Sequence, residues 1–309
     1  MKIAIIGTGA MGSIYAGLMA TDSDSQKNEV WAVDTWAEHI EAIKAKGLRV
    51  EGASGDRTVR LNATTDAAEV GPCDLVIVAT KASGVAAAAK AALSMTKPDT
   101  VILTIQNGLG AADRIAEAIS TEQVMIGVVG GFGASMKGPG HAHHNGMELV
   151  RIGEMNGGDT ERLAKVVKVW EDAGFTSKGY ADIDQLIWEK LICNCTFSGP
   201  CAITGLTVGQ VLDDPDAWEL ASSCAAEADA VARKKGVNLG FDDVNAYVHA
   251  FGSKIRGAKP SMLQDHEARR PSEIDAINGA IPREAAKLGM TAPVNETLSR
   301  IIRAKESGF

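Results

Sequence analysis

The sequence lacks several features that would place it in whole classes of protein. Its 309 residues contain no apolar run approaching the roughly 18 residues of a membrane-spanning helix, and no basic segment followed by an apolar one opens the chain. The formal net charge is −8, whereas a nucleic-acid partner requires clustered Lys and Arg. The five cysteines are odd in number and lie mostly in apolar contexts. We therefore expect a cytoplasmic protein with reduced thiols that binds neither nucleic acid nor a membrane.

Two groups of metal-ligating residue types lack the spacing of a metal site. Cys193, Cys195 and Cys201 match no zinc pattern and are predicted to be buried thiols. The segment His141–His144 lies between Gly-Pro-Gly and Asn-Gly, which predicts a polar turn between two strands, with a substrate-facing histidine as the minor alternative. No metal is expected at either place.

The chain does contain an apolar strand that runs directly into a glycine-rich turn. Ile3–Ile6 precedes Gly7-Thr8-Gly9-Ala10-Met11-Gly12, and a helical pattern follows over residues 13–20. In a dinucleotide site the first glycine permits the tight turn, the second lets the backbone approach a pyrophosphate, and the third allows close packing of helix on strand. The helix N-terminus then faces the phosphates. These six residues are the predicted pyrophosphate site.

The same pattern predicts an acidic residue at the end of the second strand, about 20 residues further on. Val30–Val33 reads as that strand and Asp34 follows it, with no Arg after it. A carboxylate there accepts hydrogen bonds from a ribose 2′-OH and repels a 2′-phosphate, so Asp34 favours NAD over NADP. Asp34 as a cap of the next helix is the alternative.

Alternating strands and helices in the first half predict an α/β fold with a Rossmann-type, doubly wound sheet. The expected elements are strands over 74–79, 101–105 and 124–129, a closing strand over 148–152, a helix over 37–46, and an inserted pair of strands over 48–50 and 58–61. From about residue 182 the patterns are helical, clearest over 183–197, 217–235, 241–251 and 273–288, with Gly236 and Gly289 as helix-ending residues. We predict a dinucleotide-binding domain over 1–180 and an all-α domain over 181–309, packed around a cleft.

Strand ends in such a sheet point toward the ligand. Lys81, Asn107 and the segment 130–133 follow predicted strands, so they should line the cofactor side. In the helical half, Lys190 and Asn194 are four residues apart and share a helix face. Lys190 reads equally as a partly desolvated proton donor or as a lysine whose head group reaches water.

Two other polar residues have structural explanations from pattern alone. Ser261 followed by Gln264 fits a capping box, and Glu273 would lie in the first turn of the next helix, where its charge favours the helix dipole. Pattern alone favours these structural roles.

A resemblance changes that balance. The ordered combination of GTGAMG, QNG, WEKLICN and KPSMLQD…PSEIDAINGAIPREAAKLGM resembles the ketopantoate reductases (2-dehydropantoate 2-reductases) along essentially the whole chain. The resemblance implies an N-terminal Rossmann domain, a helical C-terminal domain and an active site between them. It also implies reduction of the ketone of ketopantoate to D-pantoate, normally with NADPH, on the route to pantothenate.

The resemblance also implies roles for single residues. Lys190 matches the catalytic lysine that protonates the alkoxide as hydride arrives, and Glu273 matches a glutamate that holds the cofactor and helps to orient that lysine. Asn107 matches an asparagine that touches nicotinamide ribose and substrate. Substrate-binding positions match Asn194 and Ser261, and a cofactor-contacting lysine matches Lys81.

Three positions depart from the family pattern. Ser198 stands where a second substrate asparagine is expected, four residues beyond Asn194, and Val208 stands where a further one is expected. Asp34 stands where relatives that use NADPH carry an Arg near the end of the second strand. The first two put the substrate in question and the third the cofactor phosphate.

The sequence therefore predicts an NAD(P)H-dependent 2-keto acid reductase of the ketopantoate reductase type, with ketopantoate or another 2-keto acid as substrate and a homodimer as a candidate assembly. Two rivals are a 6-phosphogluconate-type hydroxyacid dehydrogenase, which also uses a helical lysine with Asn four residues on, and a nucleotide sensor without turnover. The segment from Ser261 to Glu273 speaks against the first, and the joint presence of Lys190, Asn194, Ser261 and Glu273 against the second.

Overall fold

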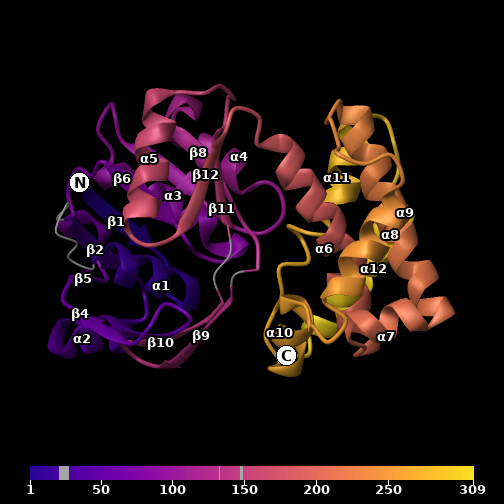
Figure 1. The fold of residues 1–309 in the computed structure, drawn as a ribbon, viewed down its shortest axis with the longest axis horizontal. Helices are drawn as coiled ribbons and strands as arrows, with labels where there is room; N and C mark the ends of the chain where they lie inside the picture. Colours follow the sequence, from indigo (N-terminus) through magenta and orange to yellow (C-terminus); the bar gives the residue numbers. More distant parts are fainter. Residues whose placement is uncertain (21–27, 132, 147–148) are drawn as a thin grey trace. The chain divides into compact units, whose positions relative to one another are not determined.

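A computed structural model describes residues 1–20, 28–131, 133–146 and 149–309 and divides the chain into two compact units. The first unit contains Met1–Gln106 and Ala111–Ile183, and the second contains Asn107–Gly110 and Asp184–Phe309 (Figure 1). The short segment Asn107–Gly110 thus groups with the helical unit although it follows a strand of the first. Phe132, in the segment 130–133 predicted to line the cofactor side, and Glu148, the first residue of the predicted closing strand, lie outside the described residues.

The first unit is built on an eight-stranded sheet with the order β12-β11-β8-β7-β6-β1-β2-β5. All neighbours are parallel except β11 and β8. Its strands are β1 (Lys2–Ile6), β2 (Glu29–Val33), β5 (Asn62–Thr64), β6 (Leu75–Val78), β7 (Val101–Thr104), β8 (Val124–Val129), β11 (Leu149–Glu154) and β12 (Thr176–Tyr180). The Rossmann-type sheet predicted from the sequence is confirmed, but the strand series does not close near residue 152, because β12 follows.

Helices cover both faces of this sheet, which explains why its central strands are continuously apolar. Ile3 and Ile5 of β1 pack in a core with residues of α1 (Ala10–Met19) and α5 (Glu161–Asp172). Ala4 and Ile6 pack in a second core with residues of α3 (Val85–Ala92) and α4 (Ala111–Ala116). Both faces of the strand are therefore buried, so its sequence is continuously apolar and does not alternate between apolar and polar residues.

A second sheet with the order β4-β3-β10-β9 packs on α1. Its strands are β3 (Leu48–Gly52), β4 (Arg57–Val59), β9 (Gly133–Gly138) and β10 (His141–Gly146), and α2 (Ala37–Lys46) precedes β3. The inserted strand pair is confirmed as β3 and β4. The polar turn predicted for His141–His144 is wrong: these residues form β10, which pairs in parallel with β3. Ala142 and His144 face inward and are buried, whereas His141 and His143 pair with the Glu51 carboxylate.

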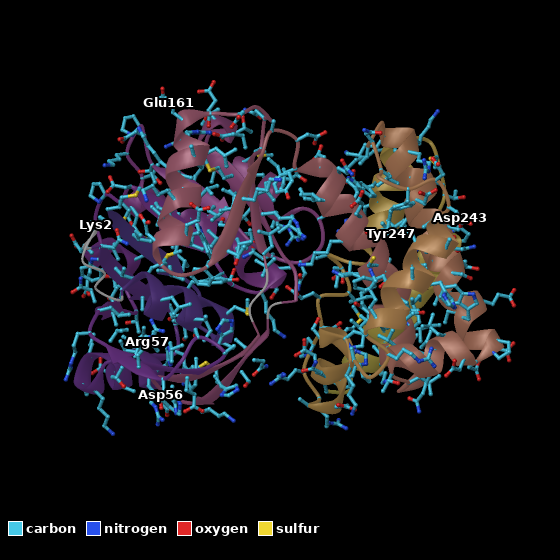
Figure 2. The ribbon with its side chains drawn as sticks, viewed as in Figure 1. Lys2, Asp56, Arg57, Glu161, Asp243 and Tyr247 are labelled. Atoms are coloured by element: carbon cyan, nitrogen blue, oxygen red, sulfur yellow. The ribbon has the colours of Figure 1, made fainter. Side chains whose placement is uncertain are left out.

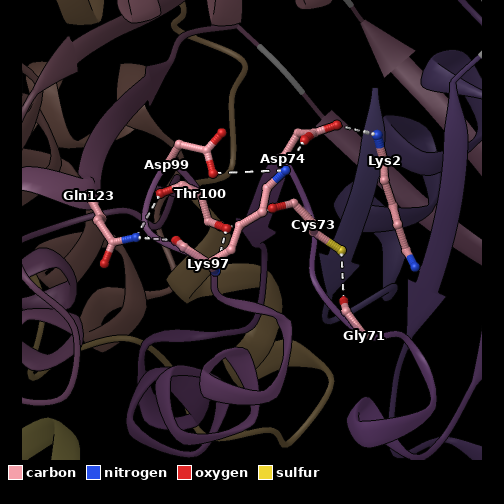
Figure 3. A network of polar contacts seen from close by, with 8 residues as sticks. All are labelled: Lys2, Gly71, Cys73, Asp74, Lys97, Asp99, Thr100 and Gln123. Carbon is pink, nitrogen blue, oxygen red and sulfur yellow. Dashed lines mark hydrogen bonds and ion pairs between the residues drawn. The ribbon is translucent and has the colours of Figure 1, made fainter.

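Polar side chains connect the N-terminal ends of the central strands (Figure 3). The Asp74 carboxylate, just before β6, accepts the Lys2 amide at 2.8 Å and pairs with Lys97 Nζ at 2.6 Å. Thr100, just before β7, donates its hydroxyl to the Cys73 carbonyl at 2.6 Å. Gln123, just before β8, donates to the Lys97 and Thr100 carbonyls at 2.8 and 3.2 Å. These polar groups at the N-terminal ends of the strands are hydrogen-bonded within the protein, in contrast to groups at the C-terminal ends described below.

The second unit is helical in its described residues. Its helices are α6 (Asp184–Thr204), α7 (Val208–Asp213), α8 (Pro215–Lys235), α9 (Val244–Lys254), α10 (Ser261–Glu267), α11 (Ala280–Lys287) and α12 (Pro293–Glu306). Asp243 caps α9 by accepting the Ala246 amide at 3.0 Å, and Tyr247 lies on the same helix (Figure 2). Gly236 ends α8 at φ +89°, as predicted. The helix predicted over 273–288 is wrong in its first half, because residues 274–279 form turns and α11 begins only at Ala280.

Candidate functional site

The glycine-rich turn connects β1 to α1, and its three glycines have different structural reasons. Gly7 adopts φ +90°, and a Cβ there would lie 2.7 Å from the Thr80 backbone nitrogen. A Cβ at Gly12 would overlap the Gly7 carbonyl oxygen. Gly9 has φ −63°, and a Cβ there would meet no atom within 4 Å. Packing therefore requires glycine at positions 7 and 12. At Gly9 no atom of the described residues requires a glycine, and the open space beside its backbone would let a ligand approach closely.

The N-terminus of α1 offers unsatisfied polar groups to an anion. Gly9 is the N-cap, no side chain caps this helix, and its first turn contains no acidic residue. The buried hydroxyl oxygens of Thr8 and Thr80 have no hydrogen-bond partner in the described part of the chain. Orphaned buried polar atoms are rare in proteins. Their position beside an uncapped helix N-terminus fits a pyrophosphate or ribose that supplies the missing partners.

Asp34 follows β2, where the sequence analysis placed the ribose-binding carboxylate. Its amide donates to the Thr64 carbonyl at 3.3 Å, and its Oδ1 accepts the Trp36 amide at 2.9 Å. The N-cap of α2 is Trp36 and has no side-chain cap, so the alternative that Asp34 is itself the cap of this helix is wrong. The Asp34–Trp36 bond instead fixes the carboxylate at the strand end.

His39 supports the glycine turn from beneath. The ring is fully buried; its Nδ1 accepts the Gly140 amide at 2.9 Å, and its Nε2 lies 3.4 Å from Ser13 Oγ. Ser13 Oγ in turn donates to the Thr8 carbonyl at 2.7 Å. Burial lowers the pKa of His39, which agrees with an Nδ1 that must stay unprotonated to accept the Gly140 amide.

Gln106, the first residue of the QNG motif, has a structural role near the candidate site that the sequence analysis did not predict. Its side-chain amide donates to the carbonyls of Val78 and Thr80 at 2.8 and 3.0 Å, and its Oε1 accepts the Ile105 amide. Gln106 thereby ties the end of β7 to the end of β6, immediately before Lys81. Lys81 itself is exposed.

In the helical unit, α6 carries three of the predicted substrate-site residues at spacings of four. Lys190 and Asn194 are half-buried, and their neighbours Leu191, Ile192 and Cys193 are buried. Ser198 follows on the same face and is 3 % exposed. The helix therefore holds a lysine, an amide and a hydroxyl in line along one face.

Ser261 and Glu273 do not have the structural roles that pattern alone favoured. The N-cap of α10 is Pro260, this helix has no side-chain cap, and Gln264 donates its side-chain amide to the Lys259 carbonyl at 2.7 Å. The predicted capping box is therefore wrong, and Ser261 is exposed. Glu273 precedes a series of turns rather than opening a helix, so the dipole explanation does not apply to it.

Hydrogen bonds hold the segment around Glu273 on both sides in the sequence. On one side Ser272 donates its amide to Glu306 Oε1 at 2.9 Å, and His266 Nε2 of α10 lies 3.0 Å from the same oxygen. On the other side the Ala276 carbonyl accepts the Leu109 amide at 2.9 Å. The structure thus brings the turn that follows Asn107 next to the segment that follows Glu273.

The remaining candidates lie in the protein core. Val208 is 1 % exposed and packs with Phe197, Val211 and Leu263, so it is a core residue rather than a replacement ligand. All five cysteines are buried and free, and burial raises the pKa of Cys193 to about 12. Among the described residues no group of three or more His, Cys, Asp or Glu is arranged to hold a metal ion. No helix in the same residues is long and apolar enough to cross a membrane.

The sheet and the glycine turn define a protein with a Rossmann-type nucleotide fold. Comparisons with known proteins identify its family. Residues 3–157 match the family model for ketopantoate reductase PanE/ApbA, and residues 182–306 match the model for its C-terminal part. The chain belongs to the ketopantoate reductase family and is an oxidoreductase of the 2-dehydropantoate 2-reductase type, as the motifs predicted.

Relatives match over the whole length of the chain. A 2-dehydropantoate 2-reductase of Lactococcus lactis is 30 % identical over 311 residues, which cover 99 % of this chain and 98 % of the relative. A crystal structure of a PanE/ApbA family ketopantoate reductase from Ralstonia eutropha has a TM-score of 0.88 at 31 % identity and covers 100 % of this chain and 99 % of that one. A ternary structure of D-mandelate dehydrogenase with NADH and anilino(oxo)acetate has a TM-score of 0.87 at 31 % identity, with the same coverage. These matches support a nicotinamide cofactor for this chain.

Proposed function

We propose that the protein reduces the ketone of a 2-keto carboxylate to the D-2-hydroxy acid, with ketopantoate as the first candidate substrate. The observation that carries this proposal is the row formed by Lys190, Asn194 and Ser198 on one face of α6, together with the exposed Ser261 that caps nothing. These side chains offer a cation, amide donors and hydroxyls, which are the groups that recognise a carboxylate and a keto oxygen.

In the proposed mechanism Lys190 is the proton donor. Its ammonium group hydrogen-bonds the keto oxygen and transfers a proton to it as negative charge develops there. The reduced nicotinamide, when bound, supplies the hydride to the carbonyl carbon. Lys190 is half-buried beside buried apolar residues, so its charge is shielded from bulk water and interacts more strongly with the developing alkoxide.

Glu273, Asn107 and Asn194 orient the reactants in this proposal. Glu273 pairs with the cofactor and with Lys190, which keeps the ammonium group directed at the keto oxygen. Asn107 contacts both the nicotinamide ribose and the substrate. The bond between Leu109 and Ala276 supports a joint role for Asn107 and Glu273, because it connects the segments that follow these two residues. Asn194 and Ser261 bind the hydroxyl and carboxylate ends of the substrate, and Ser198 contacts its side chain.

The cofactor half of the proposal rests on the first unit. The pyrophosphate is held by the glycine turn, which consists of Gly7, Thr8, Gly9, Ala10, Met11 and Gly12. Lys81 contacts the nucleotide at the end of β6. Asp34, fixed by the Trp36 amide, accepts hydrogen bonds from the ribose 2′-OH. We propose NADH as the preferred cofactor, because a carboxylate repels a 2′-phosphate at close range.

A second candidate substrate is a bulkier, more apolar 2-keto acid. Ser198 is shorter than the expected asparagine and Val208 is buried in the core, so the 4-hydroxyl of ketopantoate loses two amide partners. Each missing partner costs about 1–3 kcal/mol in a dry site. The structural neighbour D-mandelate dehydrogenase supports an aryl 2-keto acid as this alternative.

The test is a panel of 2-keto acids run with both NADH and NADPH. The comparison of kcat/KM for ketopantoate with that for an analogue lacking the 4-hydroxyl, and with that for phenylglyoxylate, distinguishes the two substrates. A preference for ketopantoate of about 100-fold or more, equivalent to about 2.7 kcal/mol, would establish the first candidate. Lys190→Ala should lower kcat by about 10²–10⁴-fold with unchanged NADH affinity, and a normal kcat in this variant would contradict the mechanism.

A further inference from the structure

A fully buried asparagine lies in the turns that follow Glu273. Asn278 is 0 % exposed, and its side-chain amide donates to the Cys195 carbonyl at 2.9 Å and to Asn295 Oδ1 at 2.9 Å. Cys195 belongs to α6 and directly follows Asn194. One side chain therefore joins the segment of Glu273 to the helix that carries Lys190.

The orientation of this amide is fixed by the rest of its network. Asn295 donates its own amide group to the Cys224 carbonyl at 3.1 Å and to Glu227 Oε2 at 2.8 Å. Glu227 also accepts the backbone amides of Val294 and Asn295 at the start of α12, at 2.8 and 2.9 Å. Because Asn295 must donate to the carboxylate, its Oδ1 is an acceptor, and Asn278 must present its nitrogen to that oxygen.

In α6, Gly199 leaves space for Asn278, and Pro200 removes one hydrogen bond from the helix. Pro200 lies inside the helix and has no N–H to donate to the Thr196 carbonyl one turn earlier. At Gly199 a Cβ would lie 2.9 Å from Asn278 Oδ1 and 2.6 Å from Leu298 Cδ2, so only glycine leaves room for this contact. A Gly-Pro pair weakens a helix, and the bond from Asn278 to Cys195 supports it at the adjoining turn.

The Asn278 side chain is only partly satisfied. Asn278 Oδ1 is buried and has no hydrogen-bond partner among the described residues. A buried acceptor without a partner is unfavourable and offsets part of the stabilisation from the two donated bonds. What the amide provides, and an apolar residue would not, is a directional bond that sets the position of α6 against the Glu273 segment.

We propose that Asn278 is a positioning residue of the reductase, acting through the Cys195 carbonyl to set the place of Lys190 relative to Glu273. It touches neither substrate nor cofactor. The inference rests on the proposed function, in which Lys190 donates the proton and Glu273 orients it. A displacement of about 1 Å at a reacting group lowers rates by about 100-fold, so loss of this bond should appear in kcat.

The experiment compares Asn278→Leu, which removes both donors at similar volume, with Ile302→Val. Ile302 is 0 % exposed in the same core, and its substitution weakens packing without altering the polar network. Each variant is assayed at a temperature well below its own Tm, with measurement of kcat, KM, NADH affinity and the pH dependence of kcat. We expect Asn278→Leu to lower kcat about 10- to 100-fold and to shift the pH profile, with NADH affinity within twofold of wild type. Ile302→Val should lower only the Tm.

A folded Asn278→Leu variant with kcat within twofold of wild type and an unchanged pH profile would overturn the inference. Asn278→Ala, which also removes both donors, is interpreted by the same criteria if the leucine variant does not fold. Lys190→Ala is assayed in parallel. A normal kcat in Lys190→Ala contradicts the proposed function, whereas an inactive Lys190→Ala beside a normal Asn278→Leu overturns only the role of Asn278.

Discussion

The backbone amide of Leu109 donates to the carbonyl oxygen of Ala276 at 2.9 Å, which joins the turn after β7 to the turns after Glu273. Gly108 adopts φ +82°, and a Cβ there would overlap the same Ala276 carbonyl. The close approach of the two segments therefore depends on a glycine with a left-handed backbone. This relationship explains why residues 107–110 group with the helical unit, and it places Asn107 and Glu273 on connected segments.

The glycine turn gives a test that separates cofactor binding from folding. We expect Gly9→Ala to leave the Tm within a few degrees of wild type, because its Cβ meets no atom within 4 Å and its φ is −63°. The same methyl group would occupy the space of the pyrophosphate and weaken NADH binding about 10-fold or more. Gly12→Ala is the matched control: its Cβ would overlap the Gly7 carbonyl, so this variant should unfold at lower temperature. Equal NADH affinity in Gly9→Ala and wild type would argue against a pyrophosphate at this turn.

Glu273 can be tested for a role beyond stability. Glu273→Gln keeps the size of the side chain and removes its charge, and because Glu273 opens no helix, no helix-dipole contact is lost with that charge. We expect Glu273→Gln to bind the cofactor more weakly and to turn over about 10-fold or more slowly, because Lys190 loses the carboxylate that orients it. Calorimetry and steady-state kinetics on the same preparation decide the matter. A variant that melts earlier yet turns over normally would assign Glu273 a structural role.

Cofactor preference should depend on the charge at position 34. Like charges about 4 Å apart repel by several kcal/mol at a surface-like dielectric constant of about 20, so the wild type should show a higher kcat/KM with NADH than with NADPH. Asp34→Arg should invert that order, and Asp34→Asn, which keeps an oxygen to accept the Trp36 amide, should reduce the preference without inverting it. A clear NADPH preference in the wild type would mean that the carboxylate does not face the ribose.

Stability should fall in mildly acidic solution because of His39. Burial lowers its folded-state pKa below the ordinary value of about 6.5, and burial lowers that of His144 likewise. Both rings are neutral in folded and unfolded chains well above pH 6.5, so their contribution is fully present there. Below about pH 6.5 the unfolded chain binds protons first, and stability decreases until the pH passes the folded-state pKa.

Urea unfolding at pH 7.5 and pH 5.5 measures this difference. His39→Gln retains hydrogen-bonding capacity without titrating, so the variant should show a smaller loss of unfolding free energy between the two pH values. An identical loss in variant and wild type would show that His39 does not contribute to the acid sensitivity.

The sequence by itself determined the parts of the protein whose signals are local. The strand Ile3–Ile6 and its glycine turn could be recognised because both the apolar run and the turn chemistry lie within a dozen consecutive residues. Asp34 could be placed at a strand end from its distance to that turn, and Lys190 and Asn194 on one helix face from their spacing. The family motifs assigned the class of reaction for the same reason, since each motif is contiguous.

Only the tertiary structure decided which segments distant in the sequence lie together. His141–Gly146 lacks the apolar alternation of a strand and becomes one because its backbone pairs with β3. Ser261 and Glu273 carry local capping patterns, yet Pro260 is the N-cap of α10, and turns separate Glu273 from the start of α11 at Ala280. Asn278 has no local pattern at all; its place is set by acceptors on α6 and α12. Pairing across the chain depends on backbone groups that every residue shares, so the identities of neighbouring residues cannot encode it.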